Sequence, residues 1–430
     1  MKNNRIPDGY LMSKGYSYYV FGLLFLLYMF DYVDRMVVVS LFPYLQSDWG
    51  LSDTQCGLLV STVYWSIVAL SIPISVVIDR WSRKKSIGLM AVFWSMASLG
   101  CAFTRSFTQL FVTRTAIGVG EAGYAPGGTA MISALFPERM RSMMVGLFTA
   151  ALPLGSAIGI ILGGYIAARF GWRHAFGIVA LPGFVIAILF FFVRDYKTVN
   201  LEKTVDKRDD NKQRMKRRDT IRQFTKTPSL ILNYIAFAGC TFLSTAYLSW
   251  LPTYFHRIDG IPMEKAALKS SVVMVLAILG FPLGGFLVDK WRKTKINARL
   301  VFPAISSLLT AAIFFIAFYY FTGAIQYYLL LLGGVTAAAF SPAAIAVTQD
   351  VIHPGLRATS YSFCVITQNL LGSSLGPLFV GMLSDKYDIH TALTVVPVSA
   401  LIAAVLFFIG SFFYERDLAK VEKITMSVEQ

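Results

Sequence analysis

Two carboxyl groups and one guanidinium stand within an apolar stretch near the start of the chain: Asp31, Asp34 and Arg35, inside the run 18–44. A run of that length can cross a bilayer as a helix. Spacings of three and four residues place the three side chains on one helical face. Each charged group at that depth costs at least ~2.5–3.5 kcal/mol, so such groups mark a functional site by default. We therefore expect this face to meet a water-filled cavity or another helix, and not lipid.

A second set of ionisable residues lies in the run 107–134. Arg114 and Glu121 are seven residues apart, which is two helical turns, so they share a face. If the N-terminus is cytoplasmic, Arg114 lies at the depth of Asp34, which allows an ion pair between them. Glu121 has no basic residue one turn away on its own helix, so burial favours its protonated form, as a proton carrier requires. The alternative for Asp34 and Glu121 is a permanent salt bridge that only holds helices together.

The composition is that of a membrane protein. Of the 430 residues, 56% are hydrophobic, and the mean hydropathy is +0.59, too apolar for an ordinary soluble domain. The net charge of +15 gathers in short loops on one side of the expected spans, and no stretch is typical of nucleic-acid binding. The four cysteines lie in apolar runs without metal-ligand or disulfide spacing. No phosphate-binding loop, nucleophile elbow or nucleophile–base pair indicates an enzyme.

Twelve hydrophobic runs are long enough to span a bilayer, so we expect an all-α membrane protein with twelve transmembrane helices. Basic residues gather at the N-terminus and in even-numbered connections, with the fifth and seventh connections as exceptions, so both termini are expected in the cytoplasm. No cleavable signal peptide is evident, and the absence of an Asn-x-Ser/Thr acceptor fits a bacterial inner membrane. The runs are 18–44, 54–78, 86–104, 107–134, 142–167, 174–193, 229–254, 267–288, 299–321, 325–348, 359–383 and 389–413.

A polar and strongly basic segment, 195–227, separates six spans from six. It divides the chain into an N-terminal six-helix bundle, 1–194, and a C-terminal six-helix bundle, 228–430. We interpret the segment as a solvated cytoplasmic linker, because charge runs are usually solvated. The alternative is a lipid-binding or regulatory tether.

A short motif, an acidic residue at a helix end followed by basic residues, occurs after the second run and again after the eighth. The two copies lie 210 residues apart (289 − 79). Such a turn can lock two helices together on the cytoplasmic side and release them when the halves of the molecule move. Its residues are therefore expected to form a conformational gate, and the alternative is a plain basic loop. The copies are Ser75-x-x-x-Asp79-Arg80-x-x-Arg83 and Gly285-x-x-x-Asp289-Lys290.

A second pair of motifs recurs at nearly the same offset in the fifth and eleventh runs. Two independent pairs indicate two related six-helix halves, with a binding site between them near the middle of the membrane. The pair consists of Arg141 before Gly155-Ser156-x-x-Gly159 and Arg357 before Gly372-Ser373-x-x-Gly376.

With these motifs the chain resembles the major facilitator superfamily and, within it, the Spinster-like branch. The resemblance implies a proton-linked carrier; animal Spinster proteins handle lysolipids and sphingoid phosphates. The chain also shares two motifs with the neighbouring branch of anion:cation symporters, which carry sugar acids and other organic anions, so the sequence does not separate the two branches. The branch motifs are Asp31-Tyr-Val-Asp34-Arg35, Arg114…Gly118-Val-Gly120-Glu121 and Arg357…Gln368-Asn369. The motifs shared with the symporters are Tyr32-Val-Asp34-Arg35 and Phe136-Pro137-Glu138-Arg139-x-Arg141.

We therefore expect a proton-coupled secondary transporter of a small organic anion or a lysolipid-like anionic amphiphile, working by alternating access. The alternatives are a sugar-acid symporter, a proton-driven multidrug exporter, which the lack of a Gly-Pro pair in the fifth run disfavours, and a non-transporting membrane sensor. The proton gradient would supply the energy, without cofactor or metal. The expected partners are a small-molecule substrate and the lipid bilayer, with no nucleic acid, and the protein is expected to be a monomer.

Three sets of residues follow from this hypothesis. For proton coupling we expect Asp31, Asp34 and Glu121. For substrate binding, we expect Arg35 and Arg114 to hold the anionic group and polar or aromatic side chains to surround the rest: Tyr28, Tyr247, Trp250, Tyr361, Gln368 and Asn369. For the conformational gate we expect Asp79, Arg80, Arg83, Asp289, Lys290, Arg141 and Arg357.

Overall fold

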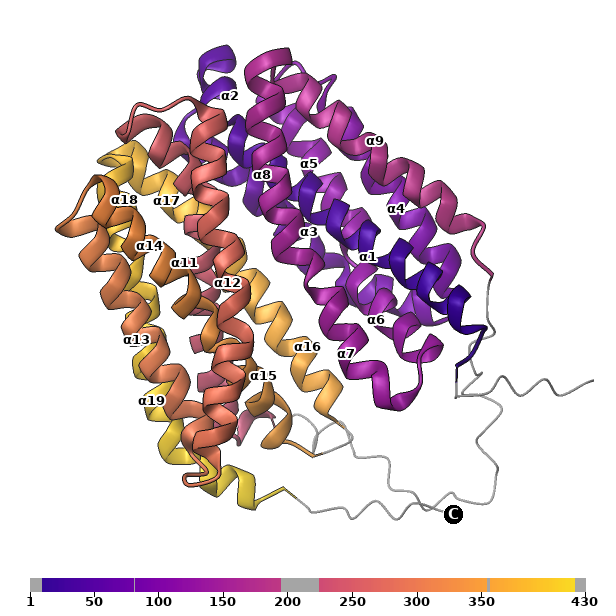
Figure 1. The fold of residues 1–430 in the computed structure, drawn as a ribbon, viewed down its shortest axis with the longest axis vertical. Helices are drawn as coiled ribbons and strands as arrows, with labels where there is room; N and C mark the ends of the chain where they lie inside the picture. The colour runs from indigo at the N-terminus through magenta and orange to yellow at the C-terminus, as the bar shows by residue number, and fades with distance from the viewer. Residues whose placement is uncertain (1–9, 81, 195–223, 354–355, 422–430) are drawn as a thin grey trace, which may run out of the picture. The chain divides into compact units, whose positions relative to one another are not determined.

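The computed structural model describes residues 10–80, 82–194, 224–353 and 356–421. Every regular element in these ranges is a helix (Figure 1), which confirms the expected all-α fold. Most of the segment expected to be a linker, 195–223, lies outside the described residues.

The first six spans include three that are broken into shorter helices. The first consists of α1 (Lys14–Val37), a 3₁₀ turn η1 (Val38–Leu41) and the short helix α2 (Phe42–Trp49). The second and third are α3 (Asp53–Arg80) and α4 (Arg83–Cys101). The fourth is α5 (Phe107–Glu121) with α6 (Tyr124–Leu135), the fifth α7 (Glu138–Thr149) with α8 (Ala151–Phe170), and the sixth α9 (Trp172–Phe191).

The last six spans repeat this mixture of continuous and broken helices. The seventh to ninth are α11 (Pro228–Ile258), α12 (Met263–Arg292) and α13 (Ala298–Tyr319). The tenth is α14 (Gly323–Ala339) with α15 (Ser341–Asp350). The eleventh is α16 (Arg357–Thr367), a π-helical turn η4 (Gln368–Ser373) and α17 (Leu375–Lys386); the twelfth is α18 (Ile389–Val395) with α19 (Pro397–Ala419).

Local chemistry explains several helix ends. Ser82 Oγ accepts a hydrogen bond from Lys85 N at 3.2 Å at the start of α4, and Ser106 Oγ accepts one from Gln109 N at 3.4 Å at the start of α5. A serine at this position satisfies a backbone donor that has no partner within the helix. Gly171 separates α8 from α9 with a φ of 87°, a backbone conformation that residues with a side chain rarely adopt.

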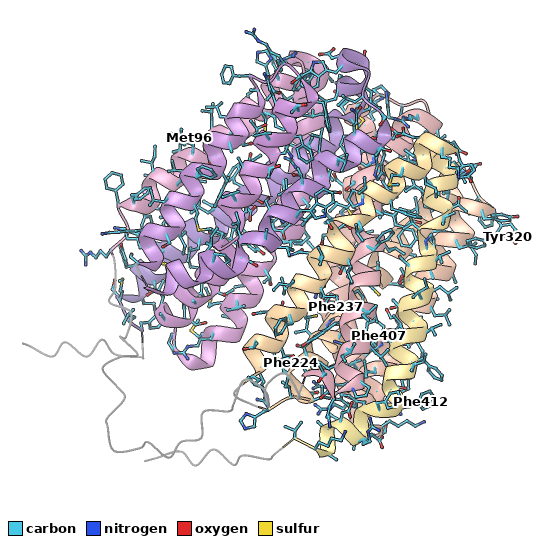
Figure 2. The ribbon with its side chains drawn as sticks, turned by 180° about the vertical axis from the view of Figure 1, so that it is seen from behind. Met96, Phe224, Phe237, Tyr320, Phe407 and Phe412 are labelled. Atoms are coloured by element: carbon cyan, nitrogen blue, oxygen red, sulfur yellow. The ribbon has the colours of Figure 1, made fainter. Side chains whose placement is uncertain are left out.

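The outer surface suits lipid. Among the described residues, nine helical stretches are long and apolar enough to cross a membrane, so the chain is a multi-pass membrane protein. Large apolar side chains point outwards from these helices, as Figure 2 shows for Met96, Tyr320 and Phe412. In water such exposure would favour aggregation, whereas in a bilayer it matches the acyl chains.

The helices group into two compact units. The first unit contains 1–197, 246–275 and 377–392, and the second contains 198–245, 276–376 and 393–430. In the first unit, α1 packs along α8 and α9, while α4 packs against α5 and α9. The end of α11, the start of α12 and most of α17 belong to this unit although they come from the second half of the sequence. The boundaries expected at 194 and 228 stay a prediction.

The second unit has a core of its own. Its helix α13 packs against both α14 and α19. Phe340 lies 4.9 Å from Phe237 and 6.0 Å from Phe407 between ring centroids, which links α11 to α19. Figure 2 labels Phe237 and Phe407. These rings belong to a cluster of fully or almost fully buried side chains. This core of the second unit is therefore apolar and aromatic. A buried carboxylate of the unit, that of Asp417, accepts hydrogen bonds from Ser229 N and Oγ.

Candidate functional site

Arg35 lies between two carboxyl groups inside the first unit. Its Nη2 atom donates hydrogen bonds to Glu121 Oε2 at 2.7 Å and to Asp31 Oδ1 at 3.1 Å. The three side chains are at most 6% exposed. The rings of Tyr32 and Tyr64 lie with their centroids 4.4 and 5.3 Å from the guanidinium carbon, at distances where an aromatic face attracts a cation. We call these five residues the Arg35 cluster.

Two helix ends hold this cluster together. Asp31 and Arg35 are one turn apart near the end of α1, and Glu121 is the last residue of α5. Helix α5 comes close to α4 at Gly120, where a Cβ atom would lie 2.8 Å from the backbone nitrogen of Trp94. Small residues permit such close approach between helices in membranes. The glycine thus lets the end of α5 sit deep enough in the bundle for Glu121 to reach Arg35.

Arg114 binds backbone carbonyl groups and forms no ion pair with Asp34. Its Nε, Nη1 and Nη2 atoms donate to the carbonyl oxygens of Leu59, Asp34 and Arg35 at 3.2, 3.0 and 2.9 Å. The last carbonyls of an α-helix have no partner within the helix, and α1 changes to 3₁₀ geometry at Val38. Arg114 donates hydrogen bonds to two of these carbonyl groups at the end of α1. It is completely buried and ties α5 to α1 and α3.

The carboxyl group of Asp34 has one hydrogen-bond donor beside it. Ser98 Oγ donates to Asp34 Oδ1 at 3.1 Å. Within the described part of the chain, Oδ2 has no hydrogen-bond partner, and the same holds for the buried hydroxyl of Ser95. A Cβ atom at Gly183 would lie 3.2 Å from Ser95 Oγ and 3.9 Å from Asp34 Oδ2, so both oxygens face the same place. The buried guanidinium of Arg114 binds the backbone carbonyl of Asp34 and not its carboxyl group, so this side chain is buried without a salt bridge to another described residue.

Tyr28 belongs to an aromatic group next to the Arg35 cluster. Its ring stacks on Phe148 with centroids 4.5 Å apart and contacts Tyr32 edge-on at 5.4 Å. Tyr124 lies 5.8 Å away, and its hydroxyl donates to the Leu24 carbonyl at 2.7 Å. Tyr28 thus forms part of an aromatic wall beside the charged groups.

The residues expected to bind substrate in the second half of the sequence are divided between the two units. Tyr247 and Trp250 are buried in the first unit, where Trp250 Nε1 donates to the Pro377 carbonyl at 2.9 Å. Tyr361, Gln368 and Asn369 belong to the second unit. Tyr361 is 38% exposed, and Gln368 Nε2 donates to Cys364 Sγ at 3.1 Å.

Gln368 and Asn369 lie in the π-helical turn η4. A π turn inserts an extra residue into a helix and is often found at functional sites. It closes with a hydrogen bond from Ser374 N to the Asn369 carbonyl at 3.0 Å. The turn changes the direction in which the Gln368 and Asn369 side chains leave the helix, which a regular eleventh span would not predict.

The structure describes the side chains of four of the seven expected gate residues. The side chains of Asp79, Arg80 and Arg83 lie outside the described residues. Arg141 Nε donates to the Phe136 carbonyl at 3.3 Å, and Arg357 Nε donates to the Gln349 carbonyl at 3.2 Å. Asp289 and Lys290 are exposed at the end of α12, and neither forms an ion pair with another described residue.

The acidic centre at this end of the second unit is Asp350, which the sequence analysis missed. Arg299 Nη1 donates to Asp350 Oδ2 at 2.6 Å, and Tyr414 Oη donates to the same oxygen at 2.7 Å. Arg292, from the basic cluster of the repeated motif, lies 4.0 Å from it. Asp350 ends an apolar helix without a basic neighbour in sequence, so only the fold reveals its partners.

Tyr64 and Ser98 were also missed. Each is one of several uncharged polar residues in its apolar run. A serine hydroxyl in such a run most often bonds to the backbone of its own helix. No spacing signal connects Tyr64 to Arg35 or Ser98 to Asp34. Among the described residues, no group of three or more His, Cys, Asp or Glu side chains has the geometry to hold a metal ion.

Known proteins match this chain over most of its length. The sequence model described as Major Facilitator Superfamily matches residues 24–377. Protein spinster homolog 1 of Xenopus tropicalis is 24% identical, and the alignment covers 96% of this chain and 84% of that protein. The hexuronate transporter of Bacillus subtilis is 26% identical over 84% of this chain and 87% of its own length. These matches confirm the expected likeness to Spinster proteins.

A solved structure shares the fold. It is the crystal structure of a bacterial homolog to the human lysosomal transporter Spinster, in an inward-facing and occupied conformation. The TM-score is 0.82 at 22% sequence identity, with 94% of this chain and 99% of that chain covered. The likeness confirms the expected architecture of twelve transmembrane helices.

Proposed function

The chain belongs to the Major Facilitator Superfamily, whose sequence model covers most of it, and we propose that it is a proton-coupled transporter of a small organic anion or an anionic amphiphile. The observation that carries the proposal is one buried guanidinium, Arg35, shared by the carboxyl groups of Asp31 and Glu121. Transport proceeds by alternating access to a site near the middle of the membrane, as in other carriers built from repeats.

The Arg35 cluster has one more acid than base. With both carboxyl groups ionised, Asp31, Arg35 and Glu121 carry a net charge of −1 (+1 − 2) inside the protein. Asp34 and Arg114 are buried next to the cluster and add one acid and one base, so the five charged groups together also carry −1 (+2 − 3) when all are ionised. Burying an uncompensated charge is strongly unfavourable, so one of the three acids holds a proton when the site is empty of other ions.

An anionic substrate and a proton bind to this cluster together. A substrate carboxylate or phosphate that binds Arg35 takes the place of Glu121 or Asp31 on the guanidinium. The displaced carboxyl group then lacks a cation and must take up a proton. Binding of the anion therefore raises the proton affinity of the site, and release of either favours release of the other. This linkage supports symport.

Asp34 and Arg114 have supporting roles in the proposal. Asp34 is a second proton carrier, because its carboxyl group is buried beside Ser98 and forms no salt bridge with another described residue. Arg114 is expected to bind the anion only if its guanidinium leaves three carbonyl oxygens. In this conformation we therefore assign Arg114 a positioning role: it holds the end of α1 so that Arg35 faces Glu121.

The chemistry of the site suits a carboxylate on a compact body. One guanidinium binds one anionic group, and the rings of Tyr28, Tyr32 and Tyr64 present flat walls for a sugar ring or an aliphatic chain. A hexuronate, carried by the Bacillus relative according to its name, combines a carboxylate with a sugar ring. A lysolipid phosphate combines one anionic group with a chain, and both remain test substrates.

We further propose the orientation and location that the loop charges indicate. Both termini lie in the cytoplasm, and the membrane is the inner membrane of a bacterium. In this orientation α1 runs outward, and Arg35 lies towards its outer end. The tyrosines at the start of α1 (Tyr16, Tyr18 and Tyr19) lie at the cytoplasmic interface, where such side chains are common.

The test is uptake into proteoliposomes with an imposed pH gradient. Radiolabelled glucuronate, galacturonate and a lysophosphatidic acid are offered separately, with the outside acidic by one pH unit. For a transported anion we expect up to about tenfold accumulation in the wild type, because one co-transported proton adds a driving force of one pH unit.

Arg35→Gln removes the anion-binding charge and is expected to abolish uptake. Arg105→Gln removes an exposed arginine from the loop between α4 and α5 and serves as a matched control that should transport normally. Equal uptake by Arg35→Gln and the wild type would refute the proposed anion site. Uptake that is unaffected by the pH gradient would refute proton coupling.

A further inference from the structure

The N-terminus of α3 carries a second dense group of polar contacts, away from the Arg35 cluster. Arg257 donates two hydrogen bonds to the carboxylate of Asp53, from Nη2 to Oδ1 at 2.6 Å and from Nη1 to Oδ2 at 2.8 Å. Ser384 Oγ donates to Asp53 Oδ2, and Gln46 Nε2 donates to Asp53 Oδ1, both at 2.5 Å. The Asp53 side chain is 7% exposed. Bidentate arginine–carboxylate pairs of this kind are among the stronger hydrogen-bonded pairs in proteins.

Asp385 binds the backbone of the same helix turn. The backbone nitrogens of Asp53 and Thr54 donate to Asp385 Oδ1 and Oδ2, each at 2.8 Å. The next nitrogen, that of Gln55, donates to Ser52 Oγ at 3.2 Å, and Ser52 N donates to Gln55 Oε1 at 3.0 Å. Ser52 and Gln55 form a local capping box. The two remaining donors of the first turn are satisfied by a carboxylate more than 330 residues away in sequence.

Two glycines let the backbones of α3 and α17 meet at this place. A Cβ atom at Gly381 would meet the carbonyl oxygen of Asp53, and its distance to Thr54 Cα would be 3.0 Å. A Cβ atom at Gly57 would lie 2.5 Å from the carbonyl oxygen of Pro377. Any side chain at either position would force the two helices apart. The glycines thus bring Asp385 within reach of the first turn of α3.

The contacts connect spans from both halves of the sequence. Gln46 and Asp53 come from the first two spans, Arg257 ends the seventh, and Ser384 and Asp385 end the eleventh. If both termini are cytoplasmic, all of these helix ends lie on the extracellular side. Alternating access, on which this inference rests, requires the two halves to part at that side during each cycle.

We propose that Gln46, Asp53, Arg257, Ser384 and Asp385 form a latch that keeps the extracellular end of the transport path closed. Opening breaks the bidentate pair of Arg257 and Asp53. Opening also separates Asp385 from the first turn of α3, so the backbone N–H groups of Asp53 and Thr54 must then hydrogen-bond to water. The latch therefore sets the equilibrium between the state closed to the outside and the state open to it, and it couples opening to loosening of the α3 N-terminus.

The experiment measures the distance across the latch without substrate. Spin labels are attached to Ser47→Cys, in α2, and Tyr387→Cys, just after α17; both native residues are exposed. The four native cysteines are buried, and a sample without the added cysteines measures any labelling of them. Double electron–electron resonance on the full-length protein in nanodiscs then gives the distribution of distances between the labels.

Asp385→Asn tests the cap, because an amide offers one oxygen acceptor to two backbone donors. Relative to the wild type, we expect the ratio of long to short distances to rise about tenfold, as expected for loss of a charge-assisted contact. We also expect faster hydrogen exchange in the peptide that covers residues 50–58. Gly381→Ala tests the same interface by steric means, without a change of charge, and should shift the distances in the same direction.

Asp388→Asn is the matched control. Asp388 is an exposed carboxylate three residues from Asp385, and its side chain accepts hydrogen bonds from Thr391 in its own segment. The Asp388→Asn substitution removes the same charge as Asp385→Asn and should leave the distances between the spin labels unchanged. Distances in Asp385→Asn and Gly381→Ala that equal those of Asp388→Asn would overturn the latch. The distances need no substrate, so absence of pH-driven transport would refute the proposed function and leave the latch standing.

Discussion

Among the single side chains, Glu121 has the most demanding role in the proposed cycle. It must bind Arg35 when the site is empty and hold a proton when an anion has displaced it. Its Oε1 atom is buried and has no hydrogen-bond partner among the described residues, while Oε2 accepts from Arg35. The carboxyl group therefore has one oxygen available to receive a proton.

Glu121→Gln separates binding from coupling. The amide oxygen still accepts a hydrogen bond from Arg35 but has no charge and takes no proton. In this variant we expect exchange of labelled for unlabelled anion at equal pH to persist. The accumulation of about tenfold that we expect for the wild type under a gradient of one pH unit should disappear. Counterflow and gradient-driven uptake in the same proteoliposomes measure both. Full gradient-driven accumulation by Glu121→Gln would show that the proton travels elsewhere.

The charged residues of the site could be predicted from the sequence, whereas their partners could not. Asp31, Arg35 and Glu121 stand out because ionisable groups are rare in apolar runs. Arg114 was expected near Asp34, and it does bind Asp34, but through the backbone carbonyl. That choice depends on the change from α to 3₁₀ geometry at Val38, which has no clear sequence signal. A hydroxyl such as that of Ser98 looks the same in sequence whether it binds its own helix or an acid.

At the level of helices, glycines decide how closely the elements of the site approach. Gly118 and Gly120 lie on α5, next to α3 and α4 respectively. A Cβ atom at Gly118 would meet the Val63 carbonyl and the Ser66 hydroxyl, so neither face of α5 has room for a side chain. The small residues of the fourth run therefore position Glu121 as well as pack the bundle.

Gly120→Ala should destabilise the folded protein. The added methyl group meets the backbone of Trp94, and overpacking of this kind costs about 1–3 kcal/mol. Gly22→Ala, in α1, is the matched control because nothing lies within 4 Å of its Cβ position. It should be neutral or stabilise by up to about 1 kcal/mol, since alanine favours the helix. Thermal unfolding of both variants in the same detergent measures the difference; equal midpoints would contradict the close approach of α5 and α4.

The order and type of the helices could be predicted well, because apolar runs of bilayer length have few alternative structures. The breaks within spans could not. Glu121 ends α5 in the middle of the fourth run, and the π turn at Gln368 interrupts the eleventh. Contacts over long sequence separations were also out of reach. No pattern in the first half of the sequence indicates that Asp53 binds Arg257 or that Asp385 caps α3.

For the molecule as a whole, the charges are distributed unevenly between the two units. The buried ionisable groups of the Arg35 cluster and of Asp34 lie in the first unit, whereas the core of the second unit is built from apolar and aromatic side chains. This asymmetry supports a division of labour in which the first unit binds the proton and the anionic group. The second unit, with Tyr361, Gln368 and Asn369, is left to recognise the body of the substrate.

The central claim is that each anion crosses the membrane with a proton, because one guanidinium serves two acids. The direct measurement follows the pH of a weakly buffered medium around proteoliposomes while a transported monovalent anion is added outside. The account predicts that the medium becomes more alkaline in step with uptake, with one proton per anion, and that an imposed membrane potential leaves the rate unchanged because the pair carries no net charge. Uptake without a pH change, or with acidification of the medium, would contradict it.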